Sequence, residues 1–115
     1  MTADCLFCKM VAGTIPPDKV YEDADILAFN DIHPRAPVHV LMVPKRHITT
    51  LNDFSDADIA LAGKLVLTGK KLAAQLGIAD SGYRIVNNCN LEGGQAVWHV
   101  HFHLLGGRQM QWPPG

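Results

Sequence analysis

The heptapeptide His99-Val100-His101-Phe102-His103-Leu104-Leu105 has a histidine at every second position and apolar residues between them. In a β-strand, successive side chains point to opposite faces, so the three imidazoles would share one face. The apolar residues Val100, Phe102 and Leu104 would line the other face. A helix would scatter both sets around its circumference. We therefore predict a strand with one buried face and one solvent-accessible face that carries chemistry, rather than a plain histidine-rich surface.

Three aligned imidazoles can do chemistry in two ways. They can bind a metal ion, but the outer pair, His99 and His103, would stand roughly 13 Å apart along a strand, at ~3.3 Å per residue. Alternatively, the middle residue His101 can act as a nucleophile or acid–base group, with its neighbours as orienting groups and proton donors. The second arrangement needs no convergence on one point, and we favour it.

The composition is that of one folded domain. The chain has 115 residues, of which 48% are hydrophobic and 18% charged,. A net charge of −1 offers no basic field for DNA or RNA, although local donors can still hold a nucleotide-sized anion,. The sequence has no apolar run of transmembrane length and no signal-peptide pattern, so we expect a cytoplasmic protein without a membrane partner. Three cysteines, an odd number, argue against a disulfide framework,.

Regular elements are predicted on both sides of the histidine strand. The other predicted strands are Val20–Glu22, Ile26–Asn30, Val38–Val43 and Gly82–Asn87,. The predicted helices are Cys5–Ala12, ended by Gly13, and a long helix capped by Ser55 that runs to Leu76, ended by Gly77,. The fold class is therefore α+β, with an antiparallel sheet of about five strands, one long helix and one short helix.

Apolar residues cover a wide arc of the long helix, which predicts contacts on two of its sides. Within it, Gly63 and Gly69 each cost ~1 kcal/mol of helix propensity relative to alanine. Close approach of another element, in the core or in a partner subunit, would justify that cost. Outside the regular elements, the loop Asp31–Pro37 and the turn Asn88–Gln95, which contains paired glycines, are candidate ligand contacts,.

These features together resemble the histidine triad (HIT) family over nearly the whole chain. Besides the His-x-His-x-His run, the matching motifs are Phe7-Cys8-Lys9, Asp31-Ile32-x-Pro34, Ala36-Pro37-x-His39, Val43-Pro44-Lys45-x-His47, Gly93-Gly94-Gln95 and Leu105-Gly106-Gly107-Arg108. The closing Trp112-Pro113-Pro114-Gly115 is similar to the Hint branch, the purine nucleotide-binding phosphoramidases. The resemblance implies a single HIT domain over residues 1–115, with 108–115 as a C-terminal tail, and a homodimer formed through the long helix and the sheet.

The resemblance also implies a reaction: hydrolysis of purine nucleoside phosphoramidates of the AMP–amine type through a covalent nucleotidyl-histidine, with no cofactor required. His101 would be the nucleophile, His103 and His39 would flank the phosphate as donors, and His99 would support His101 from behind. The implied contacts with the purine nucleotide (AMP or GMP) are Leu6, Phe7, Ile15, Phe29, Asn30, Asp31, Ile32, Asn88, Gly94 and Gln95, with Asp31 on the ribose hydroxyls. Ala96 departs from the family pattern, because relatives often have a phosphate-contacting serine there.

The motif Cys5-x-x-Cys8 gains a meaning from the same resemblance. Some family members hold a structural zinc ion with such a pair and two histidines, here His47 and His99. The alternative is two reduced thiols beside two ordinary histidines.

Two other functions stay open at this stage. One is a nucleotide-binding regulatory protein with vestigial catalysis. The other is a metal-dependent enzyme with His99 and His101 as ligands, joined in one version by His39, although no acidic residue stands in register on the strand. For the tail, we expect Trp112 to pack on the partner subunit, or else to fold back on its own.

Overall fold

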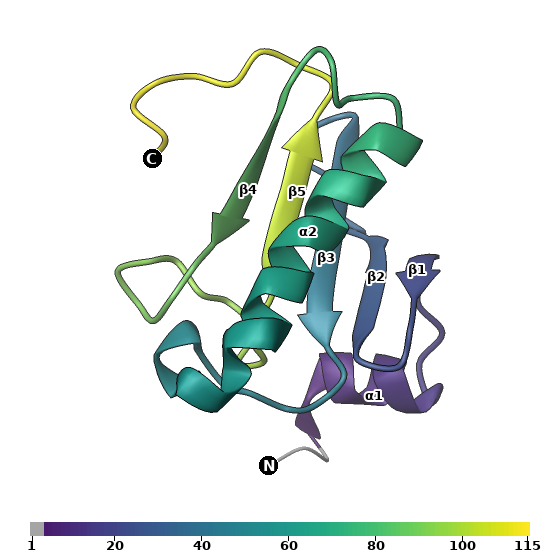
Figure 1. The fold of residues 1–115 in the computed structure, drawn as a ribbon, viewed down its shortest axis with the longest axis vertical. Coiled ribbons are helices and arrows are strands. Elements are labelled where there is room, and N and C mark those ends of the chain that lie inside the picture. The colour runs from purple at the N-terminus through teal and green to yellow at the C-terminus, as the bar shows by residue number, and fades with distance from the viewer. Residues whose placement is uncertain (1–3) are drawn as a thin grey trace.

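Within residues 4–115, which the computed structural model describes, the strands form one antiparallel sheet in the order β1-β2-β3-β5-β4 (Figure 1). The strands are β1 (Lys19–Glu22), β2 (Ile26–Asn30), β3 (Val38–Pro44), β4 (Tyr83–Asn87) and β5 (Phe102–Gly106). The helices are α1 (Leu6–Ala12) and α2 (Ile59–Gln75), with two 3-10 turns, η2 (Leu51–Asp53) and η3 (Asp56–Asp58), before α2. The predicted α+β class with a five-stranded antiparallel sheet is confirmed.

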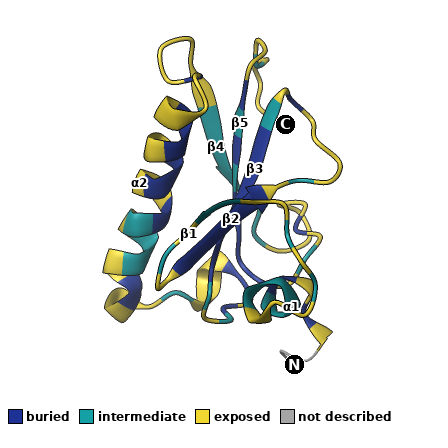
Figure 2. Cartoon of the chain, turned by 90° about the vertical axis from the view of Figure 1, so that its right-hand side faces the viewer, coloured by how far each residue is buried: buried dark blue, intermediate teal, exposed yellow. Residues whose placement is uncertain are grey.

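The two helices cover opposite faces of this sheet, as Figure 2 shows from the side. The core under α2 consists of Ile26, Ala28, Val40, Met42, Leu65, Leu72, Ala73, Ile78, Phe102 and Leu104. The core under α1 consists of Cys5, Phe7, Leu27, Phe29, Leu41 and Val43. Successive residues of β3 serve alternate cores, which explains why this strand is apolar along nearly its whole length,.

The histidine strand is shorter than the sequence predicts, because β5 begins only at Phe102. Opposite the preceding residues, β3 ends at Pro44, which has no N–H to donate to a ladder,. Side-chain bonds take over there: the Pro44 carbonyl lies 2.8 Å from Nε2 of His99. The Val100 amide instead donates to the Ile48 carbonyl at 2.6 Å. Residues 99–101 therefore lie outside the ladder and are held by bonds to the segment that follows β3 and to its last residue.

The histidine-bearing side of this segment is not the solvent-accessible face that we predicted. His99 is fully buried and His101 is 6% exposed. The cause is α1, whose Phe7 ring packs edge-on against both imidazoles, at centroid distances of 5.8 Å and 5.2 Å. The opposite side follows the prediction, since Phe102 and Leu104 belong to the core under α2.

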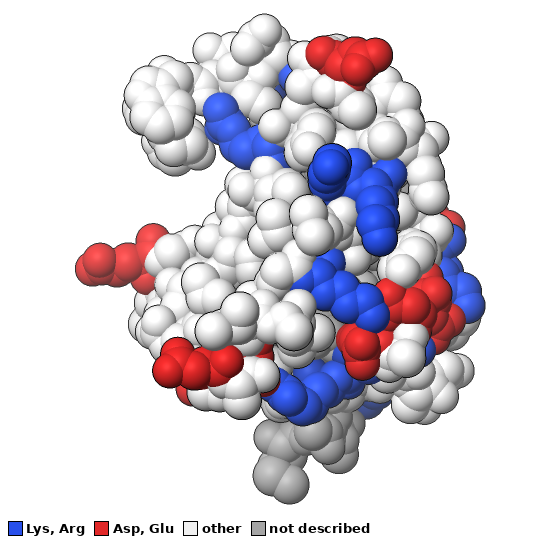
Figure 3. Space-filling model, in the orientation of Figure 1, with Lys and Arg blue, Asp and Glu red and all other residues white. Residues whose placement is uncertain are grey.

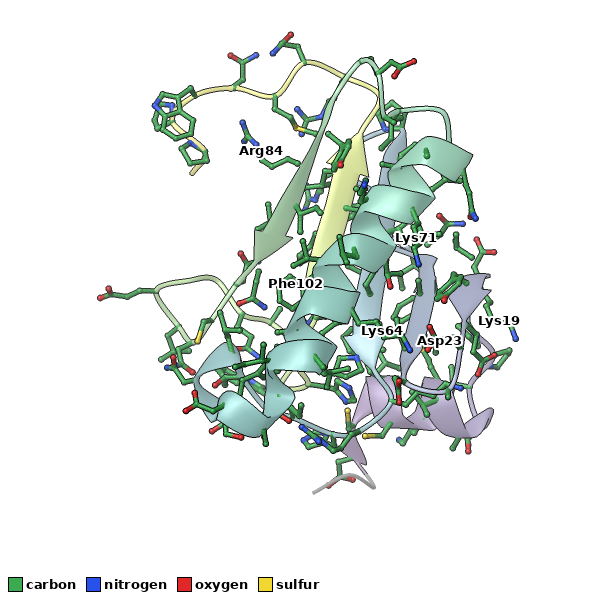
Figure 4. All side chains as sticks on the ribbon, in the orientation of Figure 1. Lys19, Asp23, Lys64, Lys71, Arg84 and Phe102 are labelled. Carbon is green, nitrogen blue, oxygen red and sulfur yellow. The ribbon has the colours of Figure 1, made fainter. Side chains whose placement is uncertain are left out.

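The long helix differs from its predicted bounds at the N-terminal end. Ser55 caps η3 rather than α2, because its hydroxyl accepts from the Ala57 amide while Asp58 accepts from the Ser55 amide at 2.9 Å. At the other end Gly77 adopts φ +78°, as expected for a helix end,. Lys64 of α2 points toward the β1–β2 turn (Figure 4), where its Nζ lies 3.2 Å from an Asp23 oxygen.

The helix packs closely against the sheet at Gly69. A Cβ there would lie 2.9 Å from Cδ1 of Ile85 and 3.2 Å from Cε of Met42, so the missing side chain brings α2 near β3 and β4. Gly63 has open space around it instead. The outer side of the helix exposes Ile59, Val66 and Leu67. The second apolar side that the sequence predicted is therefore uncovered in the single chain.

No helix among residues 4–115 is long and apolar enough to cross a membrane. The cytoplasmic location expected from the sequence stays a prediction.

Candidate active site and metal cluster

A cleft of about 570 Å³ opens between α1, the loop after β2 and the turn after β4. Phe7, Phe29 and Leu41 give it apolar walls, and His39, His101 and His103 line it as well. Further predicted contacts that line it are Leu6, Asn30, Asp31, Ile32, Asn88 and Gly94. The volume is in the usual range for a small-molecule site. The structure thus brings together most of the residues predicted for a nucleotide.

His101 is oriented by the backbone two residues before it. Its Nδ1 lies 2.8 Å from the carbonyl oxygen of His99. A carbonyl only accepts, so Nδ1 carries the proton and Nε2 keeps a free lone pair. His101 lines the cleft, and its ring stands 5.1 Å from that of His103.

His39 and His103 form a second, directed pair. The Arg35 amide donates to Nδ1 of His39 at 3.0 Å, so the proton of the neutral His39 ring lies on Nε2,. That Nε2 lies 2.9 Å from Nδ1 of His103 and 3.5 Å from a carboxylate oxygen of Asp31. Because Nδ1 of His103 accepts, the proton of the His103 ring lies on Nε2. This Nε2 is buried without a hydrogen-bond partner among the described residues, so its N–H is available to donate to a bound ligand,.

All of these imidazoles are neutral near pH 7. Burial lowers the pKa of His39, His99, His101 and His103 below the ordinary value. The effect is largest for His103, whose pKa falls to about 4 because burial is reinforced by the neighbouring His101 and His39. Neutral rings are what a nucleophilic His101 requires.

The same bonds argue against the metal-dependent enzyme considered above. Nδ1 of His39 is occupied by an amide proton, so Nε2 holds the ring proton and has no lone pair for a metal ion,. The free nitrogens of His99 and His101 also diverge: Nδ1 of His99 faces Cys5 at 3.3 Å, whereas His101 lines the cleft. The three proposed ligands do not share a centre.

Two predicted nucleotide contacts lie outside the lining of the cleft. Ile15 is absent from that lining, in the segment after α1. Gln95 is also absent, and its side chain forms hydrogen bonds with the backbone instead. Its Nε2 donates to the Thr49 carbonyl at 2.8 Å, and its Oε1 accepts from the Asn90 amide at 2.9 Å. Gln95 therefore holds the turn 88–95 in place. Gly93 serves the same turn, since a Cβ there would overlap the Cys89 carbonyl.

Several residues that line the cleft were missed by the sequence reasoning: Met10, Pro16, Pro17, Asp18, His33, Arg35, Leu41 and Val97. The prolines were interpreted only as a helix stop. His33 and Arg35 lie in the loop that the sequence did mark as a candidate ligand contact, and this was the available signal.

Beneath α1, the four predicted metal ligands meet in one cluster. The ligand atoms of Cys5, Cys8, His47 and His99 all lie within 4.8 Å of one another. Sγ of Cys8 is 3.3 Å from Nδ1 of His47 and 3.5 Å from Nδ1 of His99. Nε2 of His99 bonds the Pro44 carbonyl, which leaves Nδ1 unprotonated and aimed at the thiols,. Two thiols and two imidazoles in this arrangement fit a tetrahedral zinc ion.

The sequence profile of the HIT domain matches residues 12–110. The chain belongs to the HIT domain family. A solved HIT family hydrolase of Legionella pneumophila is 54% identical to this HIT protein and has a TM-score of 0.96, over 97% of this chain and 100% of that one. A histidine triad nucleotide-binding protein of Candida albicans is 34% identical, with a TM-score of 0.80, over 96% and 83% of the two chains.

A further relative of this HIT protein bears on the Cys/His cluster. The 14 kDa zinc-binding protein of Brassica juncea is 46% identical over 114 residues, which is 97% of this chain and 100% of that protein.

Proposed function

We propose that this HIT protein hydrolyses purine nucleoside phosphoramidates of the AMP–amine type to the nucleoside monophosphate. The observation that carries the proposal is the 2.8 Å contact between Nδ1 of His101 and the His99 carbonyl. It leaves Nε2 of a neutral imidazole as a free nucleophile in the lining of a cleft of nucleotide size,. The relatives described as a hydrolase and as a nucleotide-binding protein support the reaction class.

The reaction follows from the protonation of the three rings. Nε2 of His101 attacks the phosphorus and forms a P–N bond, while the bond from phosphorus to the amine breaks. The amine keeps the electron pair and takes a proton from water. Nε2–H of His103 donates to a phosphoryl oxygen, where negative charge develops,. Water then cleaves the nucleotidyl-His101 bond, which frees the monophosphate and restores the ring.

The rest of the cleft would hold the nucleoside. Phe7 and Phe29, whose ring centroids lie 5.4 Å apart, would pack against the base,. Asp31 would accept from the ribose hydroxyls. One of its oxygens already accepts from the His33 amide at 2.8 Å, which fixes the carboxylate in the loop.

The experiment is turnover of an adenosine phosphoramidate by metal-stripped protein, with a rapid quench in alkaline denaturant, which preserves P–N bonds, followed by intact-mass analysis. We expect release of AMP and a transient adduct of one AMP that maps to His101. Turnover without any adduct would contradict the covalent route. Binding of AMP without turnover would favour the regulatory alternative.

We also propose that Cys5, Cys8, His47 and His99 hold a structural zinc ion. The zinc-binding relative from Brassica juncea supports this assignment, as does the fit of the donor set described above. The ion would supply a cross-link between the start of α1, the segment after β3 and the segment before β5.

Finally, we propose that the chain forms a homodimer through α2 and β4. The outer side of α2 exposes Ile59 (71%) and Leu67 (55%), and β4 is an edge strand of the sheet,. Light scattering should show a dimer that Leu67→Glu converts to a monomer. Gln75→Glu, which makes the same charge change elsewhere on the helix, should leave the dimer intact. Equal masses for both variants would contradict this interface.

A further inference from the structure

The corner after β5 packs against the loop that builds one side of the cleft. Gly107 adopts φ +90°, and a Cβ there would lie 2.9 Å from Cβ of Pro37. The next residue, Arg108, donates from Nε to the carbonyl oxygen of Arg35 at 2.9 Å. The corner and the loop are thus joined by close packing and by one charge-assisted hydrogen bond.

Arg35 has a second backbone contact, on its amide side. That amide donates to Nδ1 of His39 at 3.0 Å, and it is the bond that places the ring proton of His39 on Nε2,. The loop is also tied at its start, where the Asp31 amide donates to the His39 carbonyl at 3.0 Å. The hydrogen bond from Arg108 to the Arg35 carbonyl fixes the same loop at a second point, further along the chain.

We propose that Arg108 is a positioning residue for the active site: by holding the Arg35 carbonyl, it keeps the Arg35 amide on Nδ1 of His39. This inference rests on the proposed function of the cleft. If the Arg35 backbone turned away, Nδ1 of His39 could take up the proton. His39 would then no longer donate to His103, and Nε2–H of His103 would lose its fixed direction toward the cleft.

The protein contains a matched arginine that lacks this connection. Arg84 on β4 also donates to a backbone carbonyl at 2.9 Å, but its acceptor is Gln111 in the tail. Both arginines are among the residues that line the hollow between the tail and the body, and this hollow is visible in Figure 3. Figure 4 shows Arg84 under the tail, whereas the acceptor of Arg108 lies in the loop next to His39. Arg84→Gln therefore removes a comparable bond without touching the histidine pair.

The experiment compares Arg108→Gln, Arg108→Lys and Arg84→Gln with the full wild-type chain. Nitrogen-15 NMR of the imidazoles reports the tautomer of His39, and steady-state assays report kcat and KM. For Arg108→Gln we expect loss of the single Nε2–H tautomer of His39. We expect kcat to fall by roughly tenfold to 100-fold with KM changed by less than about twofold.

Arg108→Lys, which can still donate to the Arg35 carbonyl, should restore part of both signals. Arg84→Gln should keep the single Nε2–H tautomer of His39. Unchanged His39 nitrogen shifts in folded Arg108→Gln would overturn the inference, whatever happens to the rate. Absence of turnover in the wild type would defeat the proposed function alone, since the NMR comparison still decides the role of Arg108.

Discussion

The backbone of His99 orients His101, while the side chain of His99 points elsewhere. The His99 carbonyl accepts from Nδ1 of His101 at 2.8 Å, and Nδ1 of His99 faces the sulfur of Cys5 at 3.3 Å. One residue thus contributes to two places through different atoms. The nucleophile and the Cys/His cluster should therefore be separable by mutation.

Replacing His101 by alanine should remove turnover and keep nucleotide binding. Covalent transfer needs Nε2 of His101, whereas the apolar walls and Asp31 hold the nucleoside independently. Steady-state rates and calorimetric binding of AMP check this, with Lys71→Ala, which is exposed on α2 and does not line the cleft, as the control. Activity within tenfold of wild type, a barrier change of only ~1.4 kcal/mol, would rule out His101 as the nucleophile.

Zinc removal should destabilise the fold without changing the tautomer of His101. Elemental analysis should give about one zinc per chain in wild type and Cys89→Ser, and close to none in Cys8→Ser. A strong chelator should lower the Tm of the first two proteins and leave that of Cys8→Ser unchanged. If the wild type contained almost no zinc per chain and its Tm did not change with the chelator, the four residues would not be a zinc site.

Stability should fall as the pH drops below neutrality, in part because of His103. Its pKa in the folded protein is about 4, below the ordinary value near 6.5 of an unfolded chain,. Protons therefore bind the unfolded state more readily, so the contribution of the neutral ring is complete above about pH 6.5 and is lost toward pH 4. Thermal melts between pH 7 and pH 4.5 should show a smaller loss of Tm for His103→Gln than for wild type. Parallel curves would contradict the depressed pKa.

Gly69→Val should destabilise the protein by about 1–3 kcal/mol, because the added methyl groups would meet Ile85 and Met42 in a packed interface,. A Cβ added at Gly63 would meet no neighbour. Gly63→Ala should therefore raise the free energy of unfolding by about 1 kcal/mol, because alanine has the higher helix propensity. Urea unfolding of both variants checks this. If Gly69→Val raised the free energy of unfolding as much as Gly63→Ala, the close packing of α2 on the sheet would not depend on a glycine at position 69.

Deleting Gln111–Gly115 should change selectivity among amine leaving groups more than affinity for the nucleotide. Trp112 is 82% exposed in the single chain, so it does not fold back as a staple on its own subunit. In the proposed dimer the tail would cross toward the other active site. Identical leaving-group profiles for truncated and full-length dimers would argue against that crossing.

The alternation in the histidine run predicted the strand, and it also predicted that Phe102 and Leu104 face a core. Where the ladder stops was not predictable from that run, because it depends on Pro44 of another strand. Coverage of the histidine side also depends on a distant element, the helix that carries Phe7.

Single polar residues were the weakest part of the sequence reasoning. The family resemblance implied that Gln95 contacts the nucleotide, yet its side chain bonds two segments of backbone. Arg108 closes the Leu105-Gly106-Gly107-Arg108 motif, but that motif does not reveal its partner, the carbonyl of Arg35 far along the chain. Side chains that bond backbone groups in distant segments leave no spacing in the sequence by which to find them.

The exposure of the two tryptophans gives the protein a built-in optical reporter. Trp98 is 43% exposed and Trp112 is 82% exposed in the single chain. Neither indole is deeply shielded from water, so the emission of an isolated subunit should lie toward the red. Association that buries Trp112 would shift emission to the blue, and dilution would reverse it. A fluorescence titration against protein concentration would then measure subunit affinity without any label.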